Sequence, residues 1–373
     1  MKQNHIEIKS YPFQEGVSEH HVMIHVQDRA TTYSEQLKQV FGDFVRVCRE
    51  ELAGAQPVFV RVFLSDSANQ SEELYGYLQD TAYAVSVIEQ PPLDGSKIAL
   101  WAYLQTDMQP FACPGELRAF QHNSYTHWWG GDMTAVGVDS EVQTYDLLNR
   151  YATLLEERGM NLLENCVRTW FFVQNVDVNY AGVVTGRNRL FWEKGLTTAT
   201  HFISSTGICG RKPDAKALAT MDTYAVEGLK YGQMQFLYAS DHLNPTAEYG
   251  VSFERGTYID YGDRRHLFIS GTASINNRGQ VVHPGDIRKQ VERMWENVEA
   301  LLAEGKAGFG DVAHMLVYLR DVADYELVNR MFEERFPDVP RVILWAPVCR
   351  PGWLVEMECM ALIPEGNPEY EPF

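Results

Sequence analysis

The segment Met315-Leu316-Val317-Tyr318-Leu319-Arg320-Asp321 decides the fold, because the chain contains its pattern three times. Residues 58–64, followed by Asp66, and residues 167–173, followed by Asp177, are apolar runs of the same kind. Each run follows a segment whose apolar residues have the three- and four-residue spacing of an amphipathic helix. A self-repeat that fills the chain predicts a molecule assembled from similar structural units.

We predict three α+β units, residues 1–117, 118–244 and 245–373, packed as a pseudo-trimer within one chain. In the first unit we predict a strand at 22–26, helices at 32–52 and 72–78 and a strand at 98–104. In the second unit we predict helices at 141–158 and 182–192 and a strand at 201–207. In the third unit we predict a strand at 267–271, a helix at 286–304 and a strand at 355–362. This order is typical of a sheet that carries its helices on one face. The other faces also need cover, so we expect the sheets to close around one axis, with clefts between units.

Composition and charge restrict the classes of function. The 373 residues are 45% hydrophobic and carry a formal net charge of −18, which argues against a general affinity for nucleic acid. The chain has no apolar run of about 18 residues, as a membrane helix requires, and its N-terminus lacks the apolar segment of a signal peptide. The six cysteines form no CxxC pair, and the eleven histidines form no HExxH motif. We therefore expect a cytoplasmic protein without metal, cofactor, nucleic-acid or membrane partner.

Three charged side chains of the last unit are candidates for chemistry. Arg341 precedes an apolar run, and an arginine at a sheet edge can hold a substrate carboxylate through two hydrogen bonds. Its alternative is a surface ion pair with Asp338, which is preferred from this pattern alone. Glu356 and Glu358 share one face of a strand, because strand side chains alternate. Each is either a general acid or base with a raised pKa, or part of a solvated face or of an ion pair with Arg350. For Glu358 the structural alternative is preferred, and for Glu356 both remain open.

A series of short motifs in this unit resembles the Rid/YjgF family, also labelled endoribonuclease L-PSP. The matching positions are Ile269-Ser270-Gly271, Gly279, Asp286, Gln290, Asn297, the segment 317–321, Val328-Asn329, Pro340-Arg341 and the segment 355–358. The resemblance implies three tandem units with a chorismate mutase-like fold, the first two degenerate and the third carrying the site. It also implies sites between units and the hydrolysis of reactive imines or enamines.

The same resemblance implies roles for individual residues. Arg341 takes the position that grips the substrate carboxylate, and Glu356 takes that of the carboxylate that handles the attacking water. Asn329, Ser270 and Gly271 would line the pocket. Phe253 stands where the family often has a tyrosine, and this departure weakens the assignment of an imine deaminase.

Further motifs resemble the chorismatases, which carry a Rid-like domain behind a longer N-terminal region. These motifs are the segments 249–255 and 270–275, His283-Pro284-Gly285-Asp286, Val348-Cys349-Arg350-Pro351, the segment 354–356 and Arg168-Thr169-Trp170. The segment before His283 departs from the usual Gly-His pair of that group. The resemblance adds Tyr249, Phe253, Arg255 and Cys349 to the expected substrate-binding residues, with Cys349 as a structural or pocket-lining thiol.

The first two units lack the pair of catalytic residues. By alignment, His201 takes the place of the third unit's arginine in the second unit, and Gln90-Pro91-Pro92 takes it in the first. We expect both units to act as scaffold and to supply at most one wall of a site. Arg168, Arg187 and Arg189 are expected mostly in ion pairs, although they could reach a neighbouring cleft.

Together these patterns favour an enzyme that hydrolyses a small carboxylate metabolite by metal-free acid/base chemistry, and the resemblance to chorismatases implies a reaction like theirs. The alternatives are an imine or enamine deaminase and a metabolite-binding protein without turnover. The molecule is expected to be a monomeric pseudo-trimer or a higher homo-oligomer.

Overall fold

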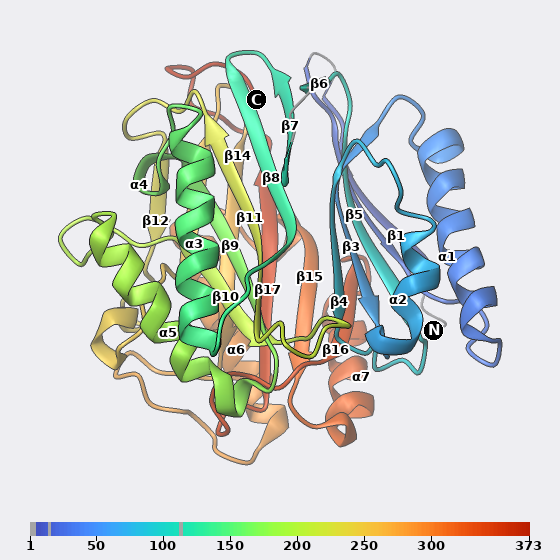
Figure 1. The fold of residues 1–373 in the computed structure, drawn as a ribbon. Helices are drawn as coiled ribbons and strands as arrows, with labels where there is room; N and C mark the ends of the chain where they lie inside the picture. The colour runs from blue at the N-terminus through green and yellow to red at the C-terminus, as the bar shows by residue number, and fades with distance from the viewer. Residues whose placement is uncertain (1–4, 14–15, 112–114) are drawn as a thin grey trace.

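The computed structural model describes residues 5–13, 16–111 and 115–373, which form three mixed β-sheets (Figure 1). Helices lie on the outside of the molecule and the sheets lie inside (Figure 1). The predicted α+β architecture of three similar units is therefore confirmed. Of the six cysteines, Cys113 lies outside the described residues, and the other five are free thiols.

The three sheets share one strand topology. The first has the order β1-β2-β5-β3-β4, made of Ile6–Tyr11, Glu19–Ile24, Ile98–Gln105, Gln56–Leu64 and Ala84–Glu89. The second has the order β10-β9-β11-β8-β7-β6, made of Ser204–Cys209, Cys166–Val173, Ala219–Glu227, Tyr125–Thr134, Leu117–His122 and Gln109–Phe111. The third has the order β12-β13-β14-β17-β15-β16, made of Met234–Leu237, Gly256–Asp260, Arg265–Ala273, Val355–Ile363, Val312–Leu319 and Arg341–Trp345. In each sheet one outer strand, β4, β10 or β16, runs parallel to its neighbour.

Each unit places one long helix and one crossover helix on its outer face. The long helices are α1 (Tyr33–Arg46, continued by the π-helical turn Val47–Glu51), α3 (Ser140–Glu156) and α6 (Ile287–Glu304). The crossover helices are α2 (Ser67–Tyr75), α5 (Val176–Glu193) and α7 (Tyr325–Arg335), and a single turn, α4 (Leu162–Asn165), precedes β9. Side-chain caps fix the starts of the long helices: Thr32 forms a capping box with Glu35, and Asp286 accepts from the Lys289 amide, as expected for that residue.

Helix α5 begins at Val176, well before the predicted start at Gly182. Gly182 and Gly186 lie inside this helix because it packs closely on α3. A Cβ atom on Gly182 would lie 2.2 Å from Ser140 Oγ, and one on Gly186 would lie 2.4 Å from the Glu141 carbonyl oxygen. The two glycines therefore permit a close helix–helix contact and do not end the helix.

The inner faces of the three sheets share one aromatic core. Phe59 of the first unit lies 5.0 Å from Trp129 of the second between ring centroids, and Trp101 of the first lies 4.2 Å from His314 of the third. One hydrophobic cluster joins buried residues of all three units. Two separate clusters lie under the helices of the first and second units. The shared core holds the units in fixed relative positions and thereby defines the clefts between them.

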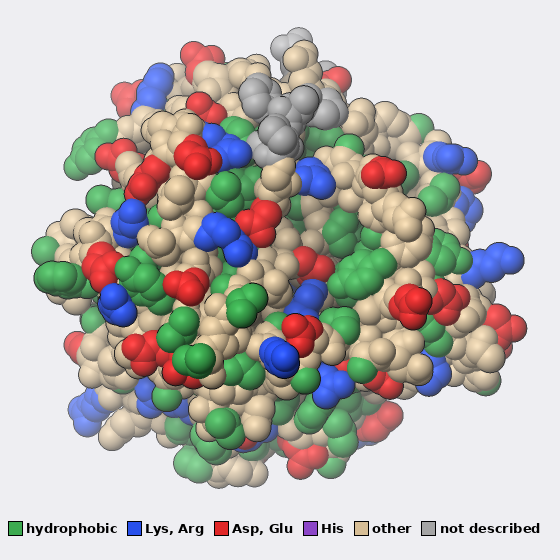
Figure 2. Space-filling model, viewed as in Figure 1, with side chains coloured by type: hydrophobic (Ala, Val, Ile, Leu, Met, Phe, Trp, Pro, Cys, Tyr) green, Lys and Arg blue, Asp and Glu red, His purple; other side chains and the backbone are tan. Residues whose placement is uncertain are grey.

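The division of the chain at 117/118 and 244/245 remains a prediction. The strand pairing places β6 in the second sheet and β12 in the third, both ahead of those positions. In the part of the chain that the structure describes, no helix is long and apolar enough to cross a membrane. On the face shown in Figure 2, acidic and basic side chains are interspersed.

Candidate active site

A small, partly open cavity lies between the second and third units. The second unit supplies side chains from α5 and β10, and the third supplies residues around β13, β14 and the start of β17. The lining residues are Tyr180, Arg187, Ser205, Gly207, Tyr249, Val251, Phe253, Arg255, Gly271, Ala273, Ile275, Cys349, Arg350, Trp353 and Glu356. Strand β10 contacts β14 directly, so the cavity forms where these two sheets meet.

Glu356 is the acidic residue of this cavity. It lies on β17 opposite Ala273 of β14 and Tyr318 of β15, and its side chain is 5% exposed. Burial, followed by the nearby negative charge of Glu358, raises the pKa of Glu356 to about 8, while Arg255 and Arg168 lower it less. No described residue forms a hydrogen bond with its carboxyl group. Glu356 is therefore protonated at neutral pH, as a general acid requires.

Gly271 gives the Glu356 carboxyl group its space. A Cβ atom at position 271 would lie 2.4 Å from Glu356 Oε1 and 3.0 Å from Thr206 Cγ2. The backbone of β14 therefore packs directly against the carboxyl group, and a side chain there would displace it.

Three arginines give the cavity its positive charge. Arg187 of α5 is 1% exposed, and its Nε and Nη2 atoms have no hydrogen-bond partner among the described residues. Arg255 donates to Asn244 O (3.0 Å) and Oδ1 (3.2 Å), and Arg350 stacks on Tyr249 with its Cζ 4.9 Å from the ring centroid. The Arg187 guanidinium lies over the Phe253 ring, with Cζ 6.0 Å from the centroid. Buried donors without hydrogen bonds are costly, so an anionic ligand beside Arg187 would be strongly stabilised.

The remaining titratable side chains of the cavity are neutral. Burial, and then the charge of Glu356, raise the pKa of Cys349 to about 12. Burial, and then Cys349, also raise the pKa of Tyr180 well above its ordinary value. Cys349 is thus a thiol in the pocket wall and not a thiolate nucleophile.

The structure brings most of the predicted site residues together. Glu356, Tyr249, Phe253, Arg255, Gly271 and Cys349 all line this cavity. Ser270 lies just behind it, where its hydroxyl accepts from Arg168 Nη1 (3.2 Å) and from the Ser205 amide (3.0 Å) and donates to the Glu254 carbonyl (2.6 Å).

Arg341 and Asn329 do not join Glu356, which corrects the expectation of one shared cleft. They line a separate small cavity between the first and third units. The Arg341 guanidinium donates to the carbonyl of Phe336 (2.8 Å), and its backbone amide donates to Glu7 Oε2 (3.0 Å). The cause is topological: β16 is the edge strand facing the first unit, while the Glu356 end of β17 faces the second.

Backbone register shows which residues correspond between units. In each unit, the residue after the central strand donates its backbone N–H to the carbonyl oxygen of a residue just before the closing strand. These bonds run from Ser65 to Lys97, from Gln174 to Leu218 and from Arg320 to Leu354. Counting from these bonds, Ala99 and Thr220 occupy the position of Glu356.

The same register corrects the alignment of Arg341. Pairing of the parallel strands places Ser205 and Val85 at its position, whereas His201 lies before β10 and Gln90-Pro91-Pro92 follows β4. The sequence alignment therefore places the counterpart of Arg341 a few residues too early in the second unit and a few residues too late in the first.

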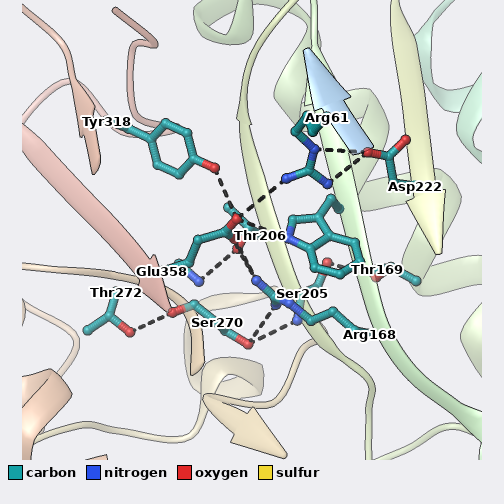
Figure 3. A network of polar contacts seen from close by, with 12 residues as sticks. Arg61, Arg168, Thr169, Ser205, Thr206, Asp222, Ser270, Thr272, Tyr318 and Glu358 are labelled. Atoms are coloured by element: carbon teal, nitrogen blue, oxygen red, sulfur yellow. Dashed lines mark hydrogen bonds and ion pairs between the residues drawn. The ribbon is translucent and has the colours of Figure 1, made fainter. Parts of the chain in front are cut away.

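The second glutamate belongs to a buried polar network that joins all three units (Figure 3). Glu358 is 3% exposed, and it accepts from Arg168 Nη2 at 2.6 Å, Trp170 Nε1 at 3.0 Å and Tyr318 Oη at 3.1 Å. It is thus neither solvated nor paired with Arg350, the two structural alternatives that the sequence suggested. Arg168 forms an ion pair between units, and Arg189 forms a surface pair with Glu193.

Arg187 is the site residue that the sequence interpretation undervalued. A signal was present, because Val183 and Leu190, four residues before it and three after, are buried with it on one face of α5. An arginine on the apolar face of a helix needs a partner there. The sequence does not show which unit packs against this face of α5 and completes the cavity.

Comparison with known proteins agrees with this architecture. Residues 255–363 match the family model described as Endoribonuclease L-PSP. A RutC family protein of Pyrococcus abyssi is 29% identical over 119 residues, which are 31% of this chain and 87% of that protein. The 3-aminoacrylate deaminase RutC of Acinetobacter baylyi is 28% identical over 97 residues, which are 26% of this chain and 77% of that protein. The third unit is thus similar in sequence to the Rid/YjgF (L-PSP) family.

A solved structure extends the likeness to most of the chain. A chorismatase crystal structure superposes with a TM-score of 0.65 and 20% sequence identity, covering 82% of this chain and 92% of the chorismatase. At this identity the likeness establishes a common fold.

Proposed function

We propose that this protein is a hydrolase for a small dicarboxylate that carries an enolpyruvyl ether, the chemical class of chorismate. The observation that carries the proposal is the buried carboxyl group of Glu356 in one cavity with three arginines, where burial raises its pKa to about 8. The chorismatase-like fold supports the same substrate class.

The chemistry of an enol ether matches a neutral carboxylic acid. Such an ether is hydrolysed when a proton is added to its terminal methylene carbon, which produces an oxocarbenium ion. Water then attacks this cation, and the hemiketal that forms breaks its C–O bond to release pyruvate and the ring alcohol. Glu356 would donate the proton as the acid and would accept one back from the attacking water as the carboxylate.

The arginines complement the two negative charges of the proposed substrate. Arg187 has unused donors for one carboxylate, and Arg255 and Arg350 add positive charge for the second. Because Glu356 is neutral before the reaction, it does not repel either carboxylate. The buried cations would also favour the carboxylate form of Glu356 once its proton has been transferred.

The experiment is an assay of pyruvate release from chorismate, coupled to lactate dehydrogenase and followed by NADH oxidation. We expect enzyme-dependent NADH loss that requires both chorismate and the folded protein. Binding of chorismate without pyruvate release, measured by calorimetry, would favour the metabolite-binding alternative and exclude hydrolysis.

A deaminase is the second candidate, because the third unit is similar in sequence to a 3-aminoacrylate deaminase. This candidate predicts ammonia release from aminoacrylates. The position that corresponds to Arg341 in the neighbouring unit is Ser205, so the cavity lacks the arginine that the family resemblance would supply. The assay with chorismate and the assay with aminoacrylate separate the two candidates directly.

A further inference from the structure

Glu358 has more partners than charge neutralisation requires. Besides Arg168, Trp170 and Tyr318, it accepts from the Thr206 hydroxyl, and Arg61 Nη1 of the first unit lies 3.8 Å away (Figure 3). Arg61 is itself held by Asp222, with Nη2 to Oδ2 at 2.8 Å. Side chains from all three units therefore fix one carboxylate at the centre of the molecule.

This carboxylate is the neighbour of Glu356 along the strand. Residues two apart on a β-strand point to the same side and lie roughly 6–7 Å apart. The segment 355–360 is fully buried, so little water separates the two carboxyl groups. In such surroundings a fixed charge acts on its neighbour more strongly than it would in water.

A second, structural link runs through Thr206. Its hydroxyl oxygen accepts from the Gly271 amide at 2.9 Å and donates to Glu358. Gly271 is the residue that packs directly on the Glu356 carboxyl group. Thr206 of the second unit thus connects Glu358 to the backbone that shapes the space around Glu356.

We propose that Glu358 is a positioning residue for Glu356, acting through its fixed charge and through Thr206 and Gly271. This proposal rests on the proposed function, in which Glu356 is the acid. In this proposal the central network also supports the reaction, besides holding the units together. The first unit contributes through Arg61, which lies beside Glu358, although no residue of that unit lines the cavity.

Several groups act on the same carboxyl group. Glu358 on its own strand, Arg168 of β9 and Arg255 before β13 act on its charge. Arg187, Tyr180, Tyr249, Cys349 and Arg350 line the same cavity. Tyr180 and Cys349 are neutral, and the arginines favour the ionised form of Glu356. Glu358 is the opposing charge in this set, so its removal has a defined sign.

The experiment measures the protonation of Glu356 without using turnover. Difference infrared spectroscopy follows the C=O band of the protonated acid, assigned by its absence in Glu356→Gln, through a titration. In Glu358→Gln the midpoint should fall by roughly one pH unit or more, because a negative neighbour is removed and Arg168 is released. An unchanged midpoint in folded Glu358→Gln overturns the proposal.

Asp222→Asn is the matched control, because it removes a carboxylate from the same buried network without removing the neighbour of Glu356. We expect it to lower stability as Glu358→Gln does and to leave the midpoint in place. Equal midpoint shifts in both variants would show a general loosening of the network and overturn the proposal.

A second pair of variants covers the case in which Glu358→Gln does not fold. Thr206→Val keeps the side-chain shape and removes the link, so the midpoint should move, and Thr206→Ser should restore it. No difference between the valine and serine variants overturns the proposal. A chain that releases no pyruvate from chorismate but shows these shifts would refute the proposed function, although Glu358 would still control the protonation of Glu356, so the two failures can be told apart.

Discussion

At the scale of single residues, the two glutamates of β17 show how surroundings divide roles. Glu358 has five polar partners, whereas none of the described residues donates a hydrogen bond to the Glu356 carboxyl group. Both side chains face the same side, so the strand pattern alone could not tell the acid from the structural carboxylate. The distinction depends on Arg168 and Thr206, which come from another unit.

Glu356→Gln should lower turnover by ~10²–10⁴-fold, because glutamine keeps the shape and cannot donate the proton. Affinity for the substrate should change little, since the arginines remain. The measurement is kcat and KM for pyruvate release. Turnover near that of the unaltered protein would remove Glu356 from the role of acid.

Arg187→Gln should weaken the binding of a dicarboxylate by about 2–5 kcal/mol, because the ligand loses a buried charged partner. Calorimetry on the folded variants measures this change. Arg341→Gln is the control, because Arg341 lies in a different cavity and bonds to backbone carbonyl groups. The reverse result, with Arg341→Gln the more damaging change, would restore the assignment that the sequence suggested.

At the scale of elements, long apolar runs predict strands well, whereas a strand interrupted by two adjacent glycines is not evident from the sequence. The strands β9 and β17 lie where their apolar residues indicated. Strand β8 was missed because Gly130 and Gly131 interrupt it, yet Gly131 lies there because β8 packs against β4, with the Val85 carbonyl 2.1 Å from an added Cβ. Contacts between units explain such residues, and a sequence pattern records only contacts within a unit.

Gly271→Ala tests the close fit between β14 and β17. The added methyl group should push the Glu356 carboxyl group out of position, so we expect at least a tenfold loss of turnover with the fold retained, since 1 Å of misplacement can cost about 10²-fold. Gly42→Ala is the matched control: nothing lies within 4 Å of its added Cβ in helix α1, and alanine there should stabilise the protein by about 0.5–1 kcal/mol. Full activity in Gly271→Ala would mean that Glu356 tolerates displacement.

At the scale of the whole molecule, buried histidine rings lie where the units meet. His21 of the first unit stacks on His314 of the third at 4.8 Å between centroids, and His122 lies 4.6 Å from His127 in the second. Burial lowers the pKa of His21 to about 3 and that of His122 to about 4, and lowers those of His127 and His314 well below the ordinary value. Packing of the three units therefore depends on these rings staying neutral.

The sign of the pH dependence follows from these shifts. The unfolded chain takes up protons on His21 below its ordinary pKa of 6.5, whereas the folded chain does so only near 3. Stability should therefore fall as the pH drops through this window, by about 3 kcal/mol for His21 alone at pH 4. Glu356 contributes with the opposite sign, because its raised pKa costs stability as the pH rises from 4.5 towards 8.

Urea unfolding at a series of pH values measures both effects. We expect one cooperative transition whose midpoint falls steeply below pH 6.5, and a shallower slope in His21→Phe, which keeps the stacked ring and cannot take up a proton.

On the alkaline side, Glu356→Gln should lose less stability between pH 4.5 and 8 than the unaltered protein, by roughly 2–4 kcal/mol. A stability that stays constant from neutral pH down to 4, or separate transitions for the three units, would contradict a common axis held together by neutral histidines. Because one core contains all three units, protonation on the axis should unfold them together.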